Sequence, residues 1–113
     1  MNQFKGLMMK YTGPVKRFEG NPILTAEDVP YKVATVHNAG VTKHNGKYIM
    51  IFRSHLTTGR SIIGIAESED GFKFTVRDKP FMTPSQEPHF REYEEFGVED
   101  ARITPLDNSY CIT

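Results

Sequence analysis

Cysteine is almost absent from this sequence: Cys111 is the only one among 113 residues. An intramolecular disulfide is therefore excluded, and stability cannot rest on cross-links. Neither sign of charge is in excess, because 14 Lys and Arg balance 14 Asp and Glu. A neutral chain exerts no long-range attraction on nucleic acid or anionic membranes, so we expect neither as a partner.

Long apolar runs are also missing. No segment approaches the ~20 apolar residues that cross a bilayer, and residues 1–12 contain no apolar run of signal-peptide length. We therefore expect a soluble, cytoplasmic protein. The histidines lack the spacing of metal ligands and no glycine-rich phosphate loop is present, so we expect neither a metal nor an organic cofactor.

The sequence does contain a succession of β signals. Residues 1–32, punctuated by Gly and Pro, are predicted to be a leading loop segment. Tight-turn signals, including Asn45-Gly46, then separate predicted strands over 33–43, 47–54, 60–68 and 72–77. Short antiparallel strands joined in this way are typical of a propeller blade, although sandwiches and barrels also use such meanders.

Strand character returns after a long connection that contains several prolines. Strands are predicted over 98–104 and from residue 110 onward. We divide the single domain into a first blade at 33–77, a connection at 78–96 and the start of a second blade at 97–113. Because the sequence stops inside an apolar strand, we expect residues 1–113 to be an N-terminal fragment holding about one and a half blades.

An internal repeat links the two predicted blades. Asn38 to Thr42 aligns with Asp100 to Thr104, 62 residues later, and the Asn45-Gly46 turn aligns with Asp107-Asn108. A period of this size suits four strands plus a long connection. Since the first strand of each blade lines the central channel of a propeller, the repeat predicts that Asn38 and Asp100 face one axial pocket.

The segment from Gly97 to Arg102 concentrates ionisable side chains at a predicted strand start. Adjacent residues on a strand face opposite ways, so we expect that Glu99 and Asp100 do not both enter the pocket by the same route. Arg102 should share the face of Asp100. A surface salt bridge at a strand end would produce the same pattern, and spacing alone does not separate the two interpretations.

Basic residues on the predicted hairpin form a second group of candidates. Arg53 closes one strand and Arg60 opens the next, so the hairpin can bring two guanidiniums together for a phosphate or polyhydroxyl ligand. His55 is a candidate partner for a sugar hydroxyl. The alternative to ligand binding is that all three side chains are solvent-exposed polar groups on the hairpin.

The order of five short motifs resembles glycoside hydrolase family 130, the mannoside phosphorylases and their relatives. The motifs are Asn21-Pro22-Ile23, His37-Asn38-Ala39-Gly40, Ile51-Phe52-Arg53, Glu69-Asp70-Gly71 and Gly97-Val98-Glu99-Asp100-Ala101-Arg102-Ile103. Each motif is weak alone, but the ordered set is specific and covers about residues 17–113. The resemblance implies an all-β, five-bladed β-propeller that is longer than this chain.

The resemblance also implies a reaction and its residues. The reaction is inverting phosphorolysis of β-1,4-mannooligosaccharide or mannosyl-glucose by inorganic phosphate, a glycosyl transfer that gives α-mannose 1-phosphate. Asp100 matches the single catalytic acid, whose proton passes through a hydroxyl of the bound mannose. Asn38 and Arg53 match mannose ligands, while Arg60 and Arg102 match supporting or phosphate-side residues more weakly. The family usually has proline where this sequence has Ala101.

Two alternatives stay open beside the β-1,4 interpretation. One is a β-1,2-mannoside phosphorylase or hydrolase of the same family, and the other is a non-catalytic glycan-binding propeller. Glu99 is the rival of Asp100 for the acid. The residues indicate neither the acceptor sugar nor the oligomeric state, and a homo-oligomer is compatible with them. Because fewer than two blades cannot close a ring, we expect residues 1–113 alone to be inactive.

Overall fold

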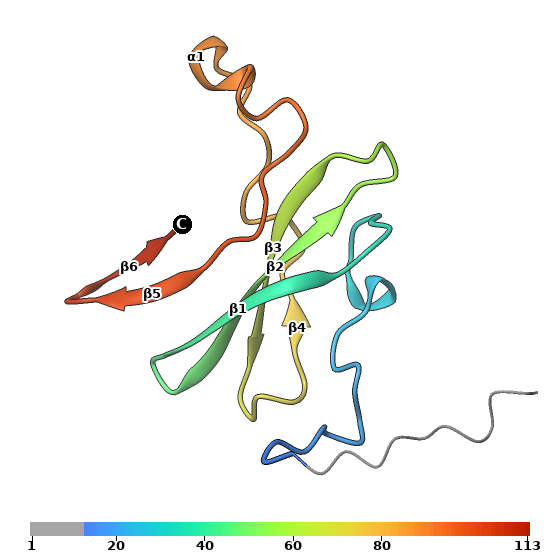
Figure 1. The fold of residues 1–113 in the computed structure, drawn as a ribbon, viewed down its shortest axis with the longest axis vertical. Coiled ribbons are helices and arrows are strands. Elements are labelled where there is room, and N and C mark those ends of the chain that lie inside the picture. Colours follow the sequence, from blue (N-terminus) through green and yellow to red (C-terminus); the bar gives the residue numbers. More distant parts are fainter. Residues whose placement is uncertain (1–12) are drawn as a thin grey trace, which may run out of the picture.

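The computed structural model describes residues 13–113, which are predominantly β (Figure 1). One antiparallel sheet contains, in chain order, β1 (His37–His44), β2 (Lys47–His55), β3 (Ser61–Ser68) and β4 (Thr75–Val76). A separate hairpin is formed by β5 (Ile103–Leu106) and β6 (Ser109–Ile112). The all-β class and the antiparallel strand order predicted from the sequence are confirmed.

Helical structure within the described residues is limited to two short pieces. These are the 3-10 turn η1 (Ala26–Asp28) and the single turn α1 (Pro88–Arg91), which projects away from the sheet in Figure 1. Neither piece is long or apolar enough to cross a membrane. The prediction that residues 1–12 lack a signal peptide lies outside the described residues.

The sheet buries both of its faces. Side chains alternate along β2, so Met50 and Phe52 pack on one face while Ile51 packs on the other. Leu24, from the segment before β1, covers the first face, and Ala101 packs against the second. Burial on both faces explains why β2 and β3 are nearly continuous apolar runs rather than alternating ones.

The two hairpins repeat each other residue by residue. Val41 pairs with Met50 in the first hairpin as Ile103 pairs with Ile112 in the second, and the three pairs toward each turn match in the same way. The turns also match, because Asn45 has φ 48° and Asp107 has φ 51°. Asn and Asp enter this left-handed region more readily than other non-glycine residues, which explains their presence at both turns.

Several predicted boundaries are wrong. The strand expected over 98–104 begins only at Ile103, because Gly97 (φ 133°) and Asp100 (φ 48°) leave the extended conformation. The fourth strand shrinks to Thr75–Val76, because the carboxylate of Asp70 binds the backbone N–H groups of residues 72 and 73 and holds them in a turn. The division into blades at 33–77, 78–96 and 97–113 stays a prediction.

Two further features were not anticipated. The connection contains α1, whose first residue is Pro88, a residue favoured at the first helical position. Cys111, inside β6, is exposed. Its neighbour Ile112 packs against the core, and successive side chains on a strand point to opposite faces, so Cys111 points away from that core.

Candidate active site

Two glycines let the segment 97–102 lie directly against the sheet. A Cβ at Gly97 would lie 2.4 Å from the backbone nitrogen of Ser61, closer than any real side chain comes. The carbonyl of Ser61 accepts a hydrogen bond from the Val98 N–H over 3.0 Å, which fixes this contact. On β1, a Cβ at Gly40 would lie 3.1 Å from the carbonyl oxygen of Ala101. The close approach of the backbone therefore explains why glycine occupies both positions.

The repeat-related residues Asn38 and Asp100 are in contact. Asn38 Nδ2 donates to Asp100 Oδ1 over 2.7 Å, and the two residues have φ angles of 50° and 48°. Asn38 lies where the β1–β2 register shifts between His37 and Gly40, an irregularity of the kind that re-aims side chains. The predicted proximity of the two residues is confirmed.

Arg53, on β2, organises the cluster. Its Nη1 donates to the same Asp100 Oδ1 over 3.2 Å, and its Nη2 donates to Glu99 Oε1 over 2.6 Å. Its Nε donates to Ser61 Oγ over 3.1 Å, and its Nη2 also lies 3.3 Å from His55 Nε2. A guanidinium has five N–H donors. Four are engaged, so one N–H on Nη1 remains for a ligand beside Asp100.

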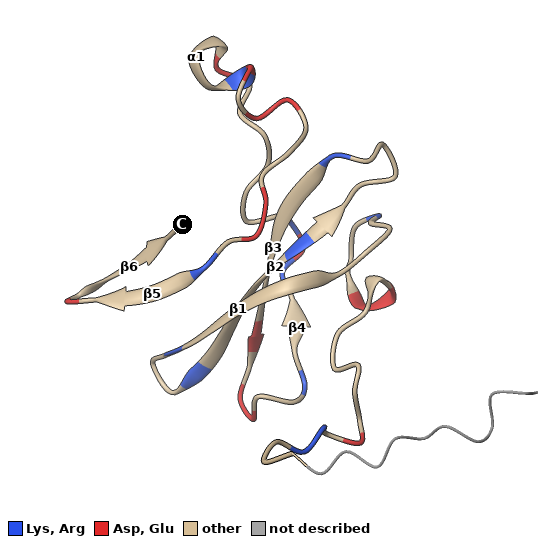
Figure 2. Cartoon of the chain, viewed as in Figure 1, with Lys and Arg blue, Asp and Glu red and all other residues tan. Residues whose placement is uncertain are grey.

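The expectation that Glu99 and Asp100 would not both enter the site by the same route is wrong. Both carboxylates contact Arg53, and Figure 2 shows their acidic segment passing beside β2 and β3. The expectation assumed an extended strand, in which consecutive side chains alternate. The left-handed backbone of Asp100 removes that alternation.

Arg102 and Arg60 lie near the cluster without joining it. The guanidinium of Arg102 donates to the backbone carbonyl of Asp100 over 3.0 Å rather than to its carboxylate. Arg60 precedes β3, and the register places Ile63 opposite Arg53, so the two guanidiniums do not face each other across the hairpin. Arg53 and Arg60 nevertheless border one open depression, together with Glu99 and Phe96.

His55 contacts the guanidinium of Arg53. His55 Nε2 lies 3.3 Å from Arg53 Nη2, and His55 Nδ1 forms a hydrogen bond of 3.0 Å with Thr35 Oγ1. Both ring nitrogens are thus engaged within the protein, and the predicted contact of His55 with a sugar stays a prediction. The sequence did not single out Thr35 or Ser61, although the register that pairs His55 with Ser61 places Ser61 diagonal to Arg53.

The charge state of Asp100 follows from its neighbours. The hydrogen bond from Asn38 is the main cause that holds the pKa of Asp100 below its ordinary value. Partial desolvation opposes this effect, while Arg53 and Arg102 reinforce it. Asp100 is therefore ionised at neutral pH in the free site. Both donors use Oδ1, and Oδ2 receives no hydrogen bond from residues 13–113, so Oδ2 is the atom open to a ligand.

The site combines the amide of Asn38, the guanidinium of Arg53 and the carboxylate of Asp100, which has one open oxygen. These groups suit a polyhydroxyl ligand, because they offer both donors and acceptors of hydrogen bonds. The sequence profile of glycoside hydrolase family 130, described as beta-1,4-mannooligosaccharide phosphorylase, matches residues 9–113. The chain belongs to this family, whose members are β-propeller proteins.

Two curated relatives carry the same name. The β-1,2-mannobiose phosphorylase of Listeria innocua is 47% identical over 55 residues, which are 49% of this chain and 14% of that protein. The β-1,2-mannobiose phosphorylase of Thermoanaerobacter sp. is 33% identical over 108 residues, covering 83% of this chain and 34% of that protein. This chain therefore spans only a minor part of their lengths.

Solved structures agree on the fold. The β-1,2-mannobiose phosphorylase of Listeria innocua, in complex with β-1,2-mannobiose, is 25% identical with a TM-score of 0.70, over 85% of this chain and 42% of that one. A glycosyl hydrolase of Bacteroides ovatus is 24% identical with a TM-score of 0.76, over 86% of this chain and 32% of that one.

Proposed function

We propose that the intact protein catalyses inverting phosphorolysis of β-mannosides, with β-1,2-mannobiose as its first substrate. Membership of the family supports mannoside phosphorolysis in general. Both curated relatives are named β-1,2-mannobiose phosphorylases, so they favour the β-1,2 alternative over the β-1,4 linkage that the sequence first suggested. A five-bladed propeller, completed by strands outside this chain, is part of the same proposal.

One observation carries the phosphorolytic mechanism: the two carboxylates have different partners. Glu99 forms the shorter ion pair with Arg53, 2.6 Å against 3.2 Å for Asp100, and accepts a hydrogen bond from the buried Ser61, whereas Asp100 lies beside Asn38 and the free N–H of Arg53. An inverting hydrolase uses a second carboxylate, about 6.5–9.5 Å from the acid, to activate a water molecule. Phosphate is already an anionic nucleophile and needs no such base, so phosphorolysis fits a site in which Glu99 pairs with Arg53 and Asp100 acts as the acid.

The reaction then proceeds in one displacement. A phosphate oxygen attacks C1 of the mannosyl unit from the face opposite the leaving oxygen, so the C1–O bond to the acceptor breaks as the bond to phosphate forms. The leaving oxygen takes a proton that originates on Asp100 Oδ2 and, as the family resemblance implies, passes through a hydroxyl of mannose. Inversion at C1 gives α-mannose 1-phosphate.

The remaining residues supply binding and charge. In this proposal, Asn38 and the free N–H of Arg53 hold the mannose beside Asp100, and Arg60, which borders the same depression as Arg53, binds phosphate. Bound phosphate brings negative charge close to Asp100, which raises the pKa of that carboxyl. This change opposes the lowering by Asn38 and favours the protonated acid that the reaction requires.

The test uses the intact protein with β-1,2-mannobiose and β-1,4-mannobiose, each with and without phosphate. The proposal predicts phosphate-dependent release of mannose 1-phosphate from the β-1,2 substrate. Release from β-1,4-mannobiose alone would establish the second candidate, which the description of the family profile favours. Free mannose released without phosphate would indicate a hydrolase, and sugar binding without turnover would indicate a glycan-binding propeller.

A further inference from the structure

One edge of the Arg53 guanidinium is enclosed in a closed ring of hydrogen bonds. Its Nε donates to Ser61 Oγ over 3.1 Å, Ser61 Oγ donates to Glu99 Oε1 over 3.2 Å, and Glu99 Oε1 accepts from Arg53 Nη2 over 2.6 Å. The serine is only 1% exposed and the Arg53 side chain is 16% exposed, whereas the Glu99 side chain is 50% exposed, so the ring extends from the buried serine to the open side of the site. Only Nη1 is left to face Asp100.

Glu99 prevents a competing arrangement. Without it, the Nε–Nη2 edge of Arg53 would lack a carboxylate, and the nearest other carboxylate is that of Asp100. Arginine and carboxylate favour a two-bond, fork-like pairing. Such a pairing would occupy both oxygens of Asp100, cover the open Oδ2 and favour the ionised form over the acid.

We propose that Glu99 is a positioning residue for phosphorolysis: together with Ser61 it holds one edge of Arg53, so that Nη1 faces the sugar and Asp100 keeps Oδ2 free. This inference rests on the proposed function. In this arrangement Glu99 touches neither the reacting carbon nor the leaving oxygen. The residue that the sequence left as a rival acid thus acts through Arg53.

The charges around Asp100 determine how the reaction should respond to pH. Arg53 contacts it from β2, His37 on β1 interacts with it electrostatically, and Glu99 and Arg102 belong to its own segment. Removing the charge of Glu99 leaves Arg53 uncompensated, which favours ionised Asp100. Turnover needs protonated Asp100, so activity falls as pH rises through the pKa of Asp100. This fall is the alkaline limb of the pH profile, and a lower pKa of Asp100 moves the limb to lower pH.

The test compares Glu99→Gln with a matched control in the intact protein, using β-1,2-mannobiose and phosphate. The amide keeps the shape and the acceptor oxygen and removes only the charge. We expect kcat/KM to fall about 10- to 100-fold, as for a displaced positioning group, with a larger change in kcat than in KM. The alkaline limb of the pH profile should move to lower pH, and Glu99→Asp should restore part of the rate.

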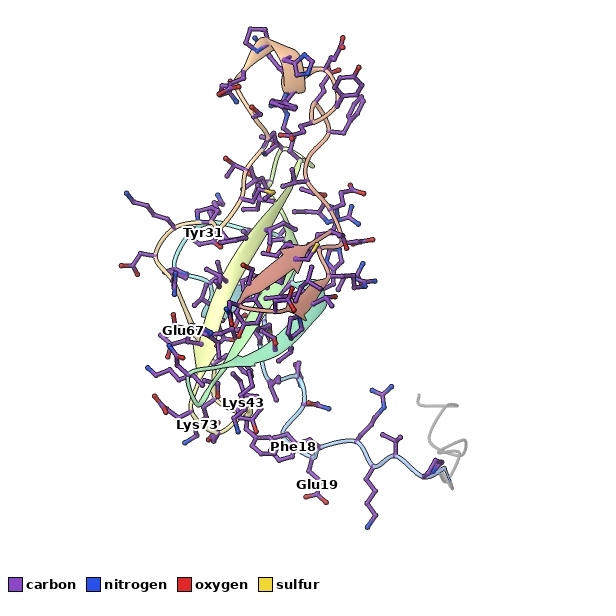
Figure 3. The ribbon with its side chains drawn as sticks, turned by 90° about the vertical axis from the view of Figure 1, so that its left-hand side faces the viewer. Phe18, Glu19, Tyr31, Lys43, Glu67 and Lys73 are labelled. Atoms are coloured by element: carbon purple, nitrogen blue, oxygen red, sulfur yellow. The ribbon has the colours of Figure 1, made fainter. Side chains whose placement is uncertain are left out.

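Glu67→Gln is the control. Glu67, labelled in Figure 3, also pairs with an arginine, Arg77, but lies near the opposite end of β3 from Ser61. Its substitution should leave kcat, KM and the pH profile unchanged. If Glu99→Gln behaves like this control, the proposal is overturned. It is also overturned if activity falls without a shift of the alkaline limb, or if Glu99→Gln abolishes turnover while Asp100→Asn retains it.

A readout independent of turnover separates this inference from the proposed function. Thermal unfolding of Glu99→Gln, Arg53→Lys and the double variant forms a double-mutant cycle. Non-additive losses in Tm are expected, because the Arg53→Lys substitution already removes the guanidinium that donates to Glu99. If the wild type turns over no mannoside and the cycle is still non-additive, the proposed function fails while the coupling stands. Additive losses would overturn the coupling itself.

Discussion

The β1–β2 and β5–β6 hairpins share a register and a turn conformation but differ in burial. Met50 in the first hairpin is 6% exposed, whereas its equivalent in the second, Ile112, is only partly buried. Strand β2 is flanked by β1 and β3, while β6 pairs only with β5 among the described residues. Turn residues and pairing therefore determine the local shape of a hairpin, and its neighbours determine how much it contributes to stability.

The same comparison extends to the site. Asn38 and Asp100 occupy equivalent positions with nearly equal φ angles, and their side chains meet through one hydrogen bond. One side chain is an amide and the other a carboxylate. The chemistry of the site therefore arises from a difference between the repeats at a position where their backbones agree.

The largest expected effect comes from making the two positions chemically alike. In Asp100→Asn the shape is kept but the proton donor is lost, so kcat should fall by about 10²- to 10⁴-fold. Mannose affinity, measured by calorimetry, should stay close to that of the wild type. A variant with near-normal kcat would remove Asp100 from the role of acid.

The glycines test how closely the second repeat is joined to the sheet. Gly97→Ala forces a Cβ against the backbone of Ser61 at an unfavourable φ, and we expect a loss of about 3–5 kcal/mol in the free energy of unfolding. Gly46→Ala, at a turn with φ 79° and no atom within 4 Å of its Cβ, is the control. It should lose only about 1–2 kcal/mol. Equal losses in denaturant unfolding would contradict the close contact.

Burial in the two hairpins can be compared by truncation. Met50→Ala should destabilise the protein by about 2–5 kcal/mol, whereas Leu106→Ala should stay within about 0.5 kcal/mol. Both variants are measured by denaturant unfolding of the intact protein. A similar loss at Leu106 would show that strands outside this chain enclose the second hairpin as fully as β3 encloses the first.

The smallest effect is expected at the turn before β4, where Asp70 lies. Hydrogen bonds from the backbone N–H groups of Lys73 and Phe72 hold the pKa of Asp70 below its ordinary value. A depressed pKa stabilises the fold above the unfolded pKa, and this contribution is lost as pH falls through the folded pKa. Asp70→Ala should therefore lower Tm at neutral pH and have no effect on it in strong acid. A Tm difference independent of pH would contradict this assignment.

Much of the local structure was accessible from the sequence. The Asn45-Gly46 turn, the succession of predicted strands and the 62-residue repeat predicted the hairpins and the proximity of Asn38 and Asp100. These features depend on neighbours in sequence or on a repeated pattern, both of which are visible in the chain itself.

The rest of the site depends on backbone geometry that residue types do not reveal. Asp100 can occupy either an extended or a left-handed conformation, and the choice decides whether Glu99 shares its side of the segment. The hydrogen bonds of Ser61 to Arg53 and Glu99 depend on the strand register and on the close approach at Gly97. The four engaged donors of Arg53 could be assigned to partners only after those contacts were known.

The most direct test of the shared site is a crystal structure of the intact protein with mannose bound. We predict that the sugar lies beside Asp100, with a hydroxyl on Oδ2 and another accepting from Arg53 Nη1, while Glu99 still holds the opposite edge of Arg53. Mannose bound elsewhere, or Asp100 Oδ2 covered by Arg53 in the complex, would contradict the central claim that two repeats converge on one sugar site.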